Sequence, residues 1–188
     1  MVTLQQPVIE EAAERGRSLL ARELVTMVER RHDTERPGIT RETLHAYVTA
    51  VRDEMAGGPD VPFDPNEFEE LVEERLNSDE SWVGDGYYRV GDGRVSVFPK
   101  QWHERLGGET DVRLYVEVLT AGRGDDDART SMGGAGRGVP QDFLLDAMAV
   151  IGGVDPDEAQ ARIERLRAEG VLAEDADQHP NPHVRLAE

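Results

Sequence analysis

One short motif occurs twice in this chain and constrains its fold more than any other feature. The two copies are Asp64-Pro65-Asn66-Glu67 and Asp155-Pro156-Asp157-Glu158. Each has an Asp that can cap a helix, a Pro at the first helical position and a Glu three residues after the cap. Apolar residues follow at helical spacing, with Ala159 and Ile163 at the positions of Phe68 and Val72. The motif predicts that the chain repeats one folding unit in which this helix has an equivalent place.

Three helices followed by a β-hairpin are predicted in the first half of the chain. Apolar residues recur at three- and four-residue spacings from Val8 to Arg31, which predicts one long amphipathic helix. Thr40 is a candidate N-cap for the second helix, and the repeated motif begins the third. The spacing of apolar residues then becomes that of strands. A turn at Gly91-Asp92-Gly93 joins the two predicted strands, Gly86–Val90 and Arg94–Phe98.

The second half is predicted to repeat this order of elements. Asp111–Thr120 has a pattern compatible with a helix or a strand, and the register of the repeat favours a helix. Pro140–Ile151 has one apolar helical face, and the next helix begins after Asp155. Two short strands, Val171-Leu172 and His183–Leu186, close the unit. The expected fold class is therefore mainly α, of the α+β type, with tandem units of three helices plus a β-hairpin.

The predicted boundary between the two units lies between residues 106 and 107. Residues 1–106 form the N-terminal unit and residues 107–188 the C-terminal unit, which contains a Gly- and Asp-rich insertion at 122–138. No Lys-Ser/Thr pair follows the glycines at 133–138, as a P-loop requires, and Asp125-Asp126-Asp127 lacks the ligand spacing of an EF-hand. We therefore expect the insertion to be a flexible segment without a phosphate or metal site.

Three helices plus a hairpin, in this order, are the plan of a winged helix-turn-helix unit. Gly138–Leu186 resembles the winged-helix domain at the C-terminus of archaeal replicative helicases. The resemblance is strongest over Val154-Asp155-Pro156-Asp157-Glu158-Ala159 and Ile163-Glu164-Arg165-Leu166-Arg167-Ala168-Glu169-Gly170-Val171-Leu172. No helicase ATPase motif accompanies these residues, so the resemblance implies a fold and not an enzyme. Two successive winged helices in an acidic chain are also similar in plan to the kite-type accessory subunits of chromosome-organising SMC complexes.

The charge composition resembles that of proteins from salt-loving archaea. The 188 residues include 39 Asp and Glu against 21 Lys and Arg, a net charge of −18, and no Cys. Twenty of the 21 basic residues are Arg, and Lys100 is the single lysine. At about 1 M salt the Debye length is about 3 Å, so a negative total charge does not exclude a nucleic-acid partner. The sequence has no apolar run long enough to cross a bilayer and no signal-peptide pattern, so we expect a cytoplasmic protein without a membrane partner.

The segment 86–106 is the most informative candidate site, because it is basic in an otherwise acidic chain. Its four cations alternate with aromatic residues, as a wing that contacts phosphates and bases requires. The candidate DNA-binding residues here are Arg89, Arg94, Lys100, Arg105, Tyr87, Tyr88 and Trp102. The alternative is structural: the arginines pair with local acids, and the residues that pack on the three helices are Tyr88, Val90, Val95 and Val97.

The third helix of each unit is the other candidate, because this helix enters the major groove when such a unit binds duplex DNA. Both helices begin with acidic residues, which oppose contact with phosphate. In the second unit, Arg162 and Arg165 partly offset them and are candidate nucleic-acid contacts. The expected function is DNA-associated work in transcription, replication or chromosome organisation. The alternative is an adaptor that binds a protein partner or a second copy of the chain.

No catalytic, cofactor or metal site is predicted. His179 and His183 are four residues apart, but Pro180 and Pro182 exclude the helix that would bring them onto one metal ion. No Gly-x-Ser-x-Gly motif accompanies the other histidines. We therefore expect a protein that is not an enzyme.

Overall fold

The computed structural model describes residues 2–31, 36–56, 58, 60–130, 138–174 and 181–187. The described chain is mainly helical, with two small three-stranded sheets. It divides into two compact units, each treated separately below. The first unit comprises Met1–Glu80 and Asp85–Lys100, and the second comprises Ser81–Gly84 and Gln101–Glu188.

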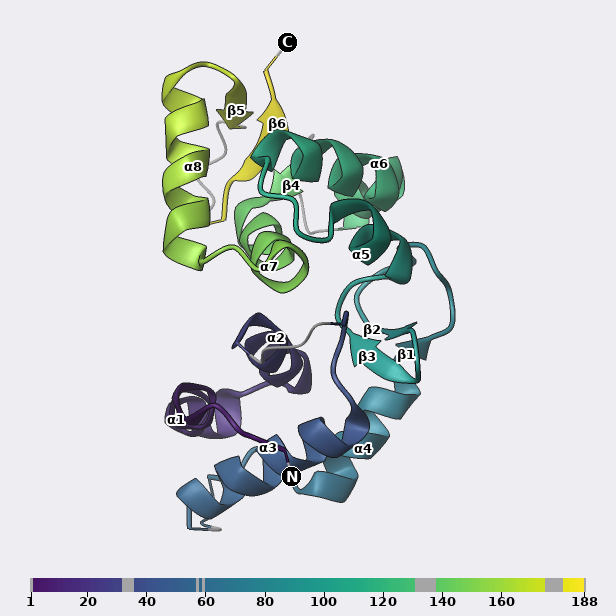
Figure 1. Cartoon of the computed structure of the whole chain (residues 1–188), viewed down its shortest axis with the longest axis vertical. Coiled ribbons are helices and arrows are strands. Elements are labelled where there is room, and N and C mark those ends of the chain that lie inside the picture. Colours follow the sequence, from purple (N-terminus) through teal and green to yellow (C-terminus); the bar gives the residue numbers. More distant parts are fainter. Residues whose placement is uncertain are drawn as a thin grey trace. The chain divides into compact units, whose positions relative to one another are not determined.

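The first unit consists of four α-helices and a small sheet (Figure 1). A 3₁₀ turn, η1 (Gly16–Ser18), separates the first two helices. The helices are α1 (Gln6–Arg15), α2 (Ala21–Arg31), α3 (Arg41–Glu54) and α4 (Pro65–Glu74), and the strands are β1 (Leu76–Asn77), β2 (Tyr87–Val90) and β3 (Arg94–Ser96). The predicted hairpin is confirmed, since β2 pairs antiparallel with β3. Strand β1, which the sequence did not predict, pairs parallel with β2.

The prediction of one helix from Val8 to Arg31 was wrong. Gly16 has a φ of 53°, a left-handed value that ends α1, and α2 begins only at Ala21. Both helices contribute buried residues to the same unit, for example Val8 and Leu24, so the apolar spacing in the sequence continues across the break. Periodicity alone therefore did not reveal where the helix stops.

The predicted helix caps are confirmed in both units. The Thr40 side chain accepts a hydrogen bond from the backbone N–H of Thr43 at the start of α3. The Asp64 carboxylate accepts from two backbone N–H groups at the start of α4, and Asp155 does the same at the start of α8 (Pro156–Ala168). The repeated motif thus begins both helices in the same way.

The second unit contains a corresponding set of helices and strands (Figure 1). Besides α8, its helices are α5 (Lys100–Leu106), α6 (Val112–Thr130) and α7 (Gln141–Gly152), and its strands are β4 (Val139–Pro140), β5 (Leu172–Glu174) and β6 (His183–Leu186). The helix expected over 111–120 is confirmed by α6. Helix α5 was not predicted. Its residues from Gln101 onward belong to the second unit, whereas the predicted boundary assigned residues 101–106 to the first.

The prediction of an unstructured insertion over 122–138 was wrong at its start. Helix α6 continues to Thr130, with non-helical dihedral angles at Gly124. Gly122 packs against an indole, since a Cβ atom there would lie 2.8 Å from Nε1 of Trp102. Glycine at this position therefore permits a close contact and does not mark a linker. Residues 131–137 lie outside the described part of the chain.

Apart from η1 and β1 in the first unit, both units follow one order of elements: two helices, a short edge strand, two helices and a hairpin. In the first unit the edge strand is a single residue, Ile39, which pairs antiparallel with Val95 of β3. In the second unit it is β4, which pairs antiparallel with β6. A glycine with positive φ precedes each edge strand, Gly38 (74°) and Gly138 (141°). The sequence analysis had not identified this second correspondence between the halves.

Among the described residues, no helix is both long enough and apolar enough to cross a lipid bilayer.

Candidate functional site

The aromatic residues of the predicted DNA-binding segment lie in the protein interior. Tyr87 is 2% exposed, Tyr88 is fully buried and Trp102 is 4% exposed. Side chains with so little exposed surface cannot stack on a base or a sugar. The prediction that these three residues form a contact surface was therefore wrong. Tyr87 and Tyr88 are adjacent in β2, so strand alternation places their side chains on opposite faces of the sheet. Both are nevertheless buried, so alternation alone could not tell a buried face from an exposed one.

The cations of the same segment are bound to groups of the protein itself. The Arg89 guanidinium lies 3.5 Å from a Glu73 carboxylate, and Lys100 lies 3.0 Å from Glu80. Arg94 donates hydrogen bonds to the carbonyls of Pro37 and Gly38, and so ties β3 to the segment before α3. The first unit thus matches the structural alternative in its packing, since Tyr88, Val90, Val95 and Val97 are all buried. Arg89 pairs with an acid as that alternative expects, whereas Arg94 binds backbone carbonyls instead.

The remaining predicted cations lie in the second unit. Arg162 donates to the Thr110 carbonyl (2.9 Å) and to the Glu158 carboxylate (2.5 Å), so it is partly engaged. Arg105 on α5 and Arg165 on α8 are exposed, and neither makes an ion pair among the described residues. Arg162 and Arg165 line a solvent-open hollow together with Glu158 and Glu169. The structure brings these two arginines together, but acidic side chains share their surroundings.

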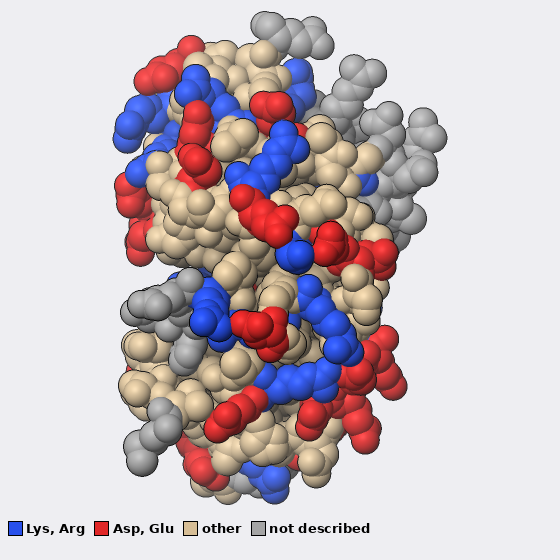
Figure 2. Space-filling view, turned by 45° about the vertical axis from the view of Figure 1, so that its right-hand side comes forward, with Lys and Arg blue, Asp and Glu red and all other residues tan. Residues whose placement is uncertain are grey.

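Helices α4 and α8 differ sharply in charge although they occupy equivalent places. Helix α4 has no Lys or Arg and five glutamates, Glu67, Glu69, Glu70, Glu73 and Glu74. Helix α8 balances three acids, Asp157, Glu158 and Glu164, with three bases, Arg162, Arg165 and Arg167. Elsewhere the charges are mixed: Figure 2 shows Lys and Arg side chains next to Asp and Glu over the visible face. The strongly acidic face of α4 is thus a local feature of the first unit.

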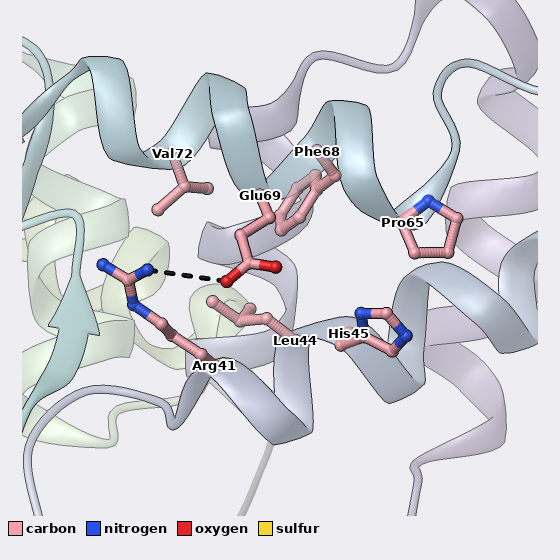
Figure 3. Close-up of a pocket in the computed structure, with 7 residues that line it drawn as sticks. All are labelled: Arg41, Leu44, His45, Pro65, Phe68, Glu69 and Val72. Carbon is pink, nitrogen blue, oxygen red and sulfur yellow. Dashed lines mark ion pairs between the residues drawn. The ribbon is translucent and has the colours of Figure 1, made fainter.

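A shallow groove lies between α3 and α4 (Figure 3). We refer to it as the α3–α4 groove. Its apolar lining residues are Leu44, Pro65, Phe68 and Val72. Its polar lining residues are Arg41 and His45 on α3 and Glu69 on α4. The Arg41 guanidinium lies 3.6 Å from the Glu69 carboxylate, and it also pairs with Glu73.

Phe68 and Val72 were predicted as part of an apolar helix face, whereas the residues at the rim of this groove were not predicted to form a site. A signal was present. Arg41 and His45 are four residues apart on α3, and Glu69 and Glu73 are four apart on α4, so each pair lies on one side of its helix. The spacing does not show that these two helix sides face each other, because this depends on how α3 and α4 cross in the folded unit.

A buried carboxylate lies beneath the hairpin of the first unit. Glu29 on α2 accepts a hydrogen bond from the backbone N–H of Val97 (2.9 Å). Burial raises the pKa of Glu29 to about 7, although hydrogen bonds from Val97 and Ser96 and the positive charges of Arg22 and Arg94 oppose the shift. Glu29 follows Met27 and Val28 directly but precedes Arg30 and Arg31, so its position in the sequence did not predict burial.

The interior of the second unit holds an aromatic cluster and a buried histidine. The indoles of Trp82 and Trp102 stack at a centroid separation of 5.0 Å, and the Phe143 ring meets both edge-on. The Arg123 guanidinium lies 4.7 Å from the Phe143 ring centre, in cation–π geometry. His103 on α5 is buried, and burial lowers its pKa to about 4, so it is neutral at pH 7. Trp82, Trp102 and His103 are buried, whereas Phe143 and Arg123 are partly exposed.

Within the described residues, no group of three or more His, Asp or Glu side chains is placed to hold a metal ion. His179, one of the two histidines considered for a metal site, lies outside the described part.

Comparison of the chain with protein-family models, curated proteins and solved structures gives no match.

Proposed function

We propose that both units are winged helix-turn-helix units and that the chain is a tandem winged-helix protein. The support is topological. In each unit an edge strand precedes two helices and pairs with the second strand of the following hairpin. The capping Asp residues of α4 and α8 mark the equivalent helices, each the last helix before the hairpin and the counterpart of the third helix of a winged helix-turn-helix unit. Such a unit presents its third helix and its hairpin to a partner.

The function that the geometry supports best is that of a non-enzymatic adaptor that binds a protein partner. The observation that carries this proposal is the charge of α4, the helix that would enter the major groove. It has five carboxylates and no cation, and phosphate repels such a face. Neighbouring cations offset this charge only in part: Arg41 and Arg89 pair with Glu69 and Glu73, whereas Glu67, Glu70 and Glu74 make no ion pair among the described residues. Lys100 pairs with Glu80, and Arg94 binds backbone carbonyls.

Cross-linking with a reagent that couples carboxylates tests the adaptor. The full-length chain is expressed in a halophilic host, captured at molar KCl and cross-linked before digestion and mass spectrometry. We expect cross-links from one partner protein to concentrate on the glutamates of α4, whereas exposed acids elsewhere, such as Glu10 and Glu54, give few. A chain that yields no protein cross-links but retains nucleic acid would overturn the adaptor proposal.

A second candidate function is DNA binding through the second unit, and the exposed Arg105 and Arg165 favour it. Replacing both by Ser would then abolish binding, whereas the control Arg36→Ser with Arg52→Ser removes the same charge from the first unit without effect. Equal loss in both double variants would indicate a general charge effect and would count against a specific interface.

We further propose that the protein works in the cytoplasm of a halophilic archaeon. The support is the composition: a net charge of −18, one lysine and no cysteine. Like charges repel within the folded chain when salt no longer screens them. The melting temperature should therefore fall substantially as KCl is diluted from molar to tens of millimolar. An unchanged melting temperature would contradict the halophilic origin.

A further inference from the structure

We infer that Arg22 and Glu29 of α2 form a clamp on the open end of the hairpin in the first unit, and that a proton on Glu29 controls how often this clamp opens. Neither residue belongs to the exposed face of α4 on which the adaptor proposal depends. The clamp is therefore a separate feature of the fold, and it stands or falls independently of the partner.

The clamp consists of hydrogen bonds from side chains of α2 to the backbone of the hairpin. Arg22 donates to the carbonyl of Gly86 (2.6 Å) and to the carbonyl of Val97 (3.4 Å). Glu29, two helical turns further along α2, accepts from the N–H of Val97 (2.9 Å). Both backbone polar groups of Val97 are thus bound by side chains, as a neighbouring strand would otherwise bind them.

The clamp acts where the hairpin ends. Gly86 directly precedes β2, and Val97 directly follows β3. The chain passes to the second unit a few residues beyond each of them, because Ser81–Gly84 and Gln101–Glu188 belong to that unit. The state of the clamp therefore determines how firmly both connecting segments are held on the first unit.

Glu29 is the member of the clamp that can gain or lose a proton near neutral pH. Its Oε1 atom is buried and has no hydrogen-bond partner among the described residues, which penalises the ionised form. Burial raises the pKa of Glu29 to about 7, against hydrogen bonds from Val97 and Ser96. Among the described residues, the charged groups that act on Glu29 are Arg22 on its own helix and Arg94 on β3, and both lower its pKa.

A rise in pH should open the clamp. Opening exposes Glu29 to water, where its ordinary pKa is 4.5, so the closed clamp binds the proton more tightly than the open clamp. The equilibrium constant for opening should therefore rise about fortyfold between pH 5 and pH 7. It should rise only about twofold more between pH 7 and pH 9, because the closed clamp also loses its proton there.

Native-state hydrogen exchange of the full-length chain, followed by NMR in 2 M KCl with low concentrations of urea, tests this inference. The Val97 amide reports on the clamp, and the Val48 amide in α3 reports on unfolding of the whole unit. After correction for intrinsic exchange, we expect Val97 to open more often than Val48, with little dependence on urea and the fortyfold rise with pH. Equal opening constants with equal urea dependence would overturn the inference, because Glu29 would then be exposed only by unfolding of the unit.

A direct titration of the wild-type chain needs no variant. The carbon-13 resonance of the Glu29 carboxyl group should titrate with a midpoint near pH 7. The amide proton of Val97 should follow with the same midpoint, because it donates to this carboxyl group. A Glu29 midpoint near its ordinary value of 4.5, or a Val97 amide that does not follow it, would contradict control by this proton.

Three variants assign the effect to the clamp. Glu29→Gln retains an acceptor oxygen but cannot ionise, so the opening constant at Val97 should change less than twofold between pH 5 and pH 7. The control Glu42→Gln removes a carboxylate from an exposed position on α3 and should retain the fortyfold rise. Arg22→Gln removes a positive charge that lowers the pKa of Glu29, so it should move the midpoint to higher pH. A fortyfold rise that persists in Glu29→Gln, or a midpoint that Arg22→Gln leaves unchanged, would contradict the clamp.

Discussion

Helices α4 and α8 begin with the same cap and occupy the same place in their units, yet one carries five acids and no base in its sequence and the other equal numbers of acids and bases. The shared features are those that build the unit: the capping Asp, the Pro after it and the buried apolar residues. The exposed faces are free to differ because they contribute little to stability. The comparison teaches that two equivalent helices can share a cap and a buried face while their exposed faces carry different charges.

The interiors of the two units differ as well. The first unit buries a carboxylate, Glu29, and the second buries an imidazole, His103. Burial opposes the charged form of both groups, so it raises the pKa of the acid and lowers the pKa of the base. The two units should therefore respond to acid in opposite directions, although their order of elements is the same.

The largest expected effect tests whether the glycines before the two edge strands are equivalent. Gly38→Ala and Gly138→Ala should each destabilise their unit by roughly 3 to 5 kcal/mol, because both combine a positive φ with a close backbone contact. A Cβ atom would lie 2.9 Å from the Val95 carbonyl oxygen at Gly38 and 2.7 Å from the Val184 carbonyl oxygen at Gly138. Urea unfolding followed by fluorescence reports on the second unit, because both tryptophans belong to it, and hydrogen exchange of β3 reports on the first.

Gly91→Ala is the control for this pair. Its φ is 43°, but a Cβ atom there would meet no atom within 4 Å. It should cost only about 1 to 2 kcal/mol, the penalty of the left-handed conformation alone. If Gly138→Ala costs no more than Gly91→Ala, the proposed equivalence of the two edge strands is wrong.

Glu29→Gln should flatten the pH dependence of the first unit. The folded-state pKa of Glu29, about 7, exceeds its ordinary value of 4.5. The wild-type unit should therefore gain stability as pH falls from 7 to 4.5, by about 3 kcal/mol relative to the variant. Hydrogen exchange of the β3 amides at a series of pH values measures the difference. A difference that does not change with pH would show that Glu29 is ionised at little cost in the folded protein.

His103→Gln should flatten the opposite trend in the second unit. The pKa of His103 falls from 6.5 to about 4 on folding. The contribution of neutral His103 to the free energy of unfolding is fully present above pH 6.5. As pH falls from 6.5 toward 4, the second unit should lose about 3 kcal/mol of this stability. Tryptophan fluorescence in urea at each pH provides the measurement. Loss of stability between pH 6.5 and 4 that is equal in the variant and the wild type would assign the trend to other groups.

The smallest expected effect is that of the shared caps. Asp64→Ala and Asp155→Ala should each cost about 1 kcal/mol, because each removes a carboxylate that accepts from two N–H groups. Asp64→Asn and Asp155→Asn retain an acceptor oxygen and should cost less. Similar values in the two units are expected from thermal unfolding. A cost at one site only would show that the repeated motif does not have the same structural role twice.

Local signals predicted much of the fold, and tertiary packing determined the rest. Asp64, Asp155 and Thr40 marked helix starts correctly, because capping depends only on neighbouring backbone groups. The turn at Gly91-Asp92-Gly93 located the hairpin for the same reason. The break at Gly16 was missed because the buried face continues in register across it.

The candidate site was harder to predict, since it depends on which groups meet across the fold. Tyr87, Tyr88 and Trp102 suggested a stacking surface, but their large apolar area is buried in the core. Arg94 suggested a phosphate contact, but the carbonyl groups that it binds lie 56 and 57 residues away in sequence. The α3–α4 groove likewise forms only where two helices cross.

The most direct test of the central claim, that this tandem fold presents a surface for protein and not for DNA, is a titration of labelled duplex DNA with the full-length chain. Fluorescence anisotropy of a fluorescein-labelled duplex is measured at several KCl concentrations from 0.1 M upward. We expect a dissociation constant above about 10⁻⁴ M even at the lowest salt concentration, because α4 repels phosphate. The adaptor proposal would be contradicted by saturable binding with a dissociation constant below about 10⁻⁶ M. Such binding should weaken with salt, with a slope of log binding constant against log salt concentration near −0.9 per phosphate contact, and it should be lost in the Arg105→Ser, Arg165→Ser variant.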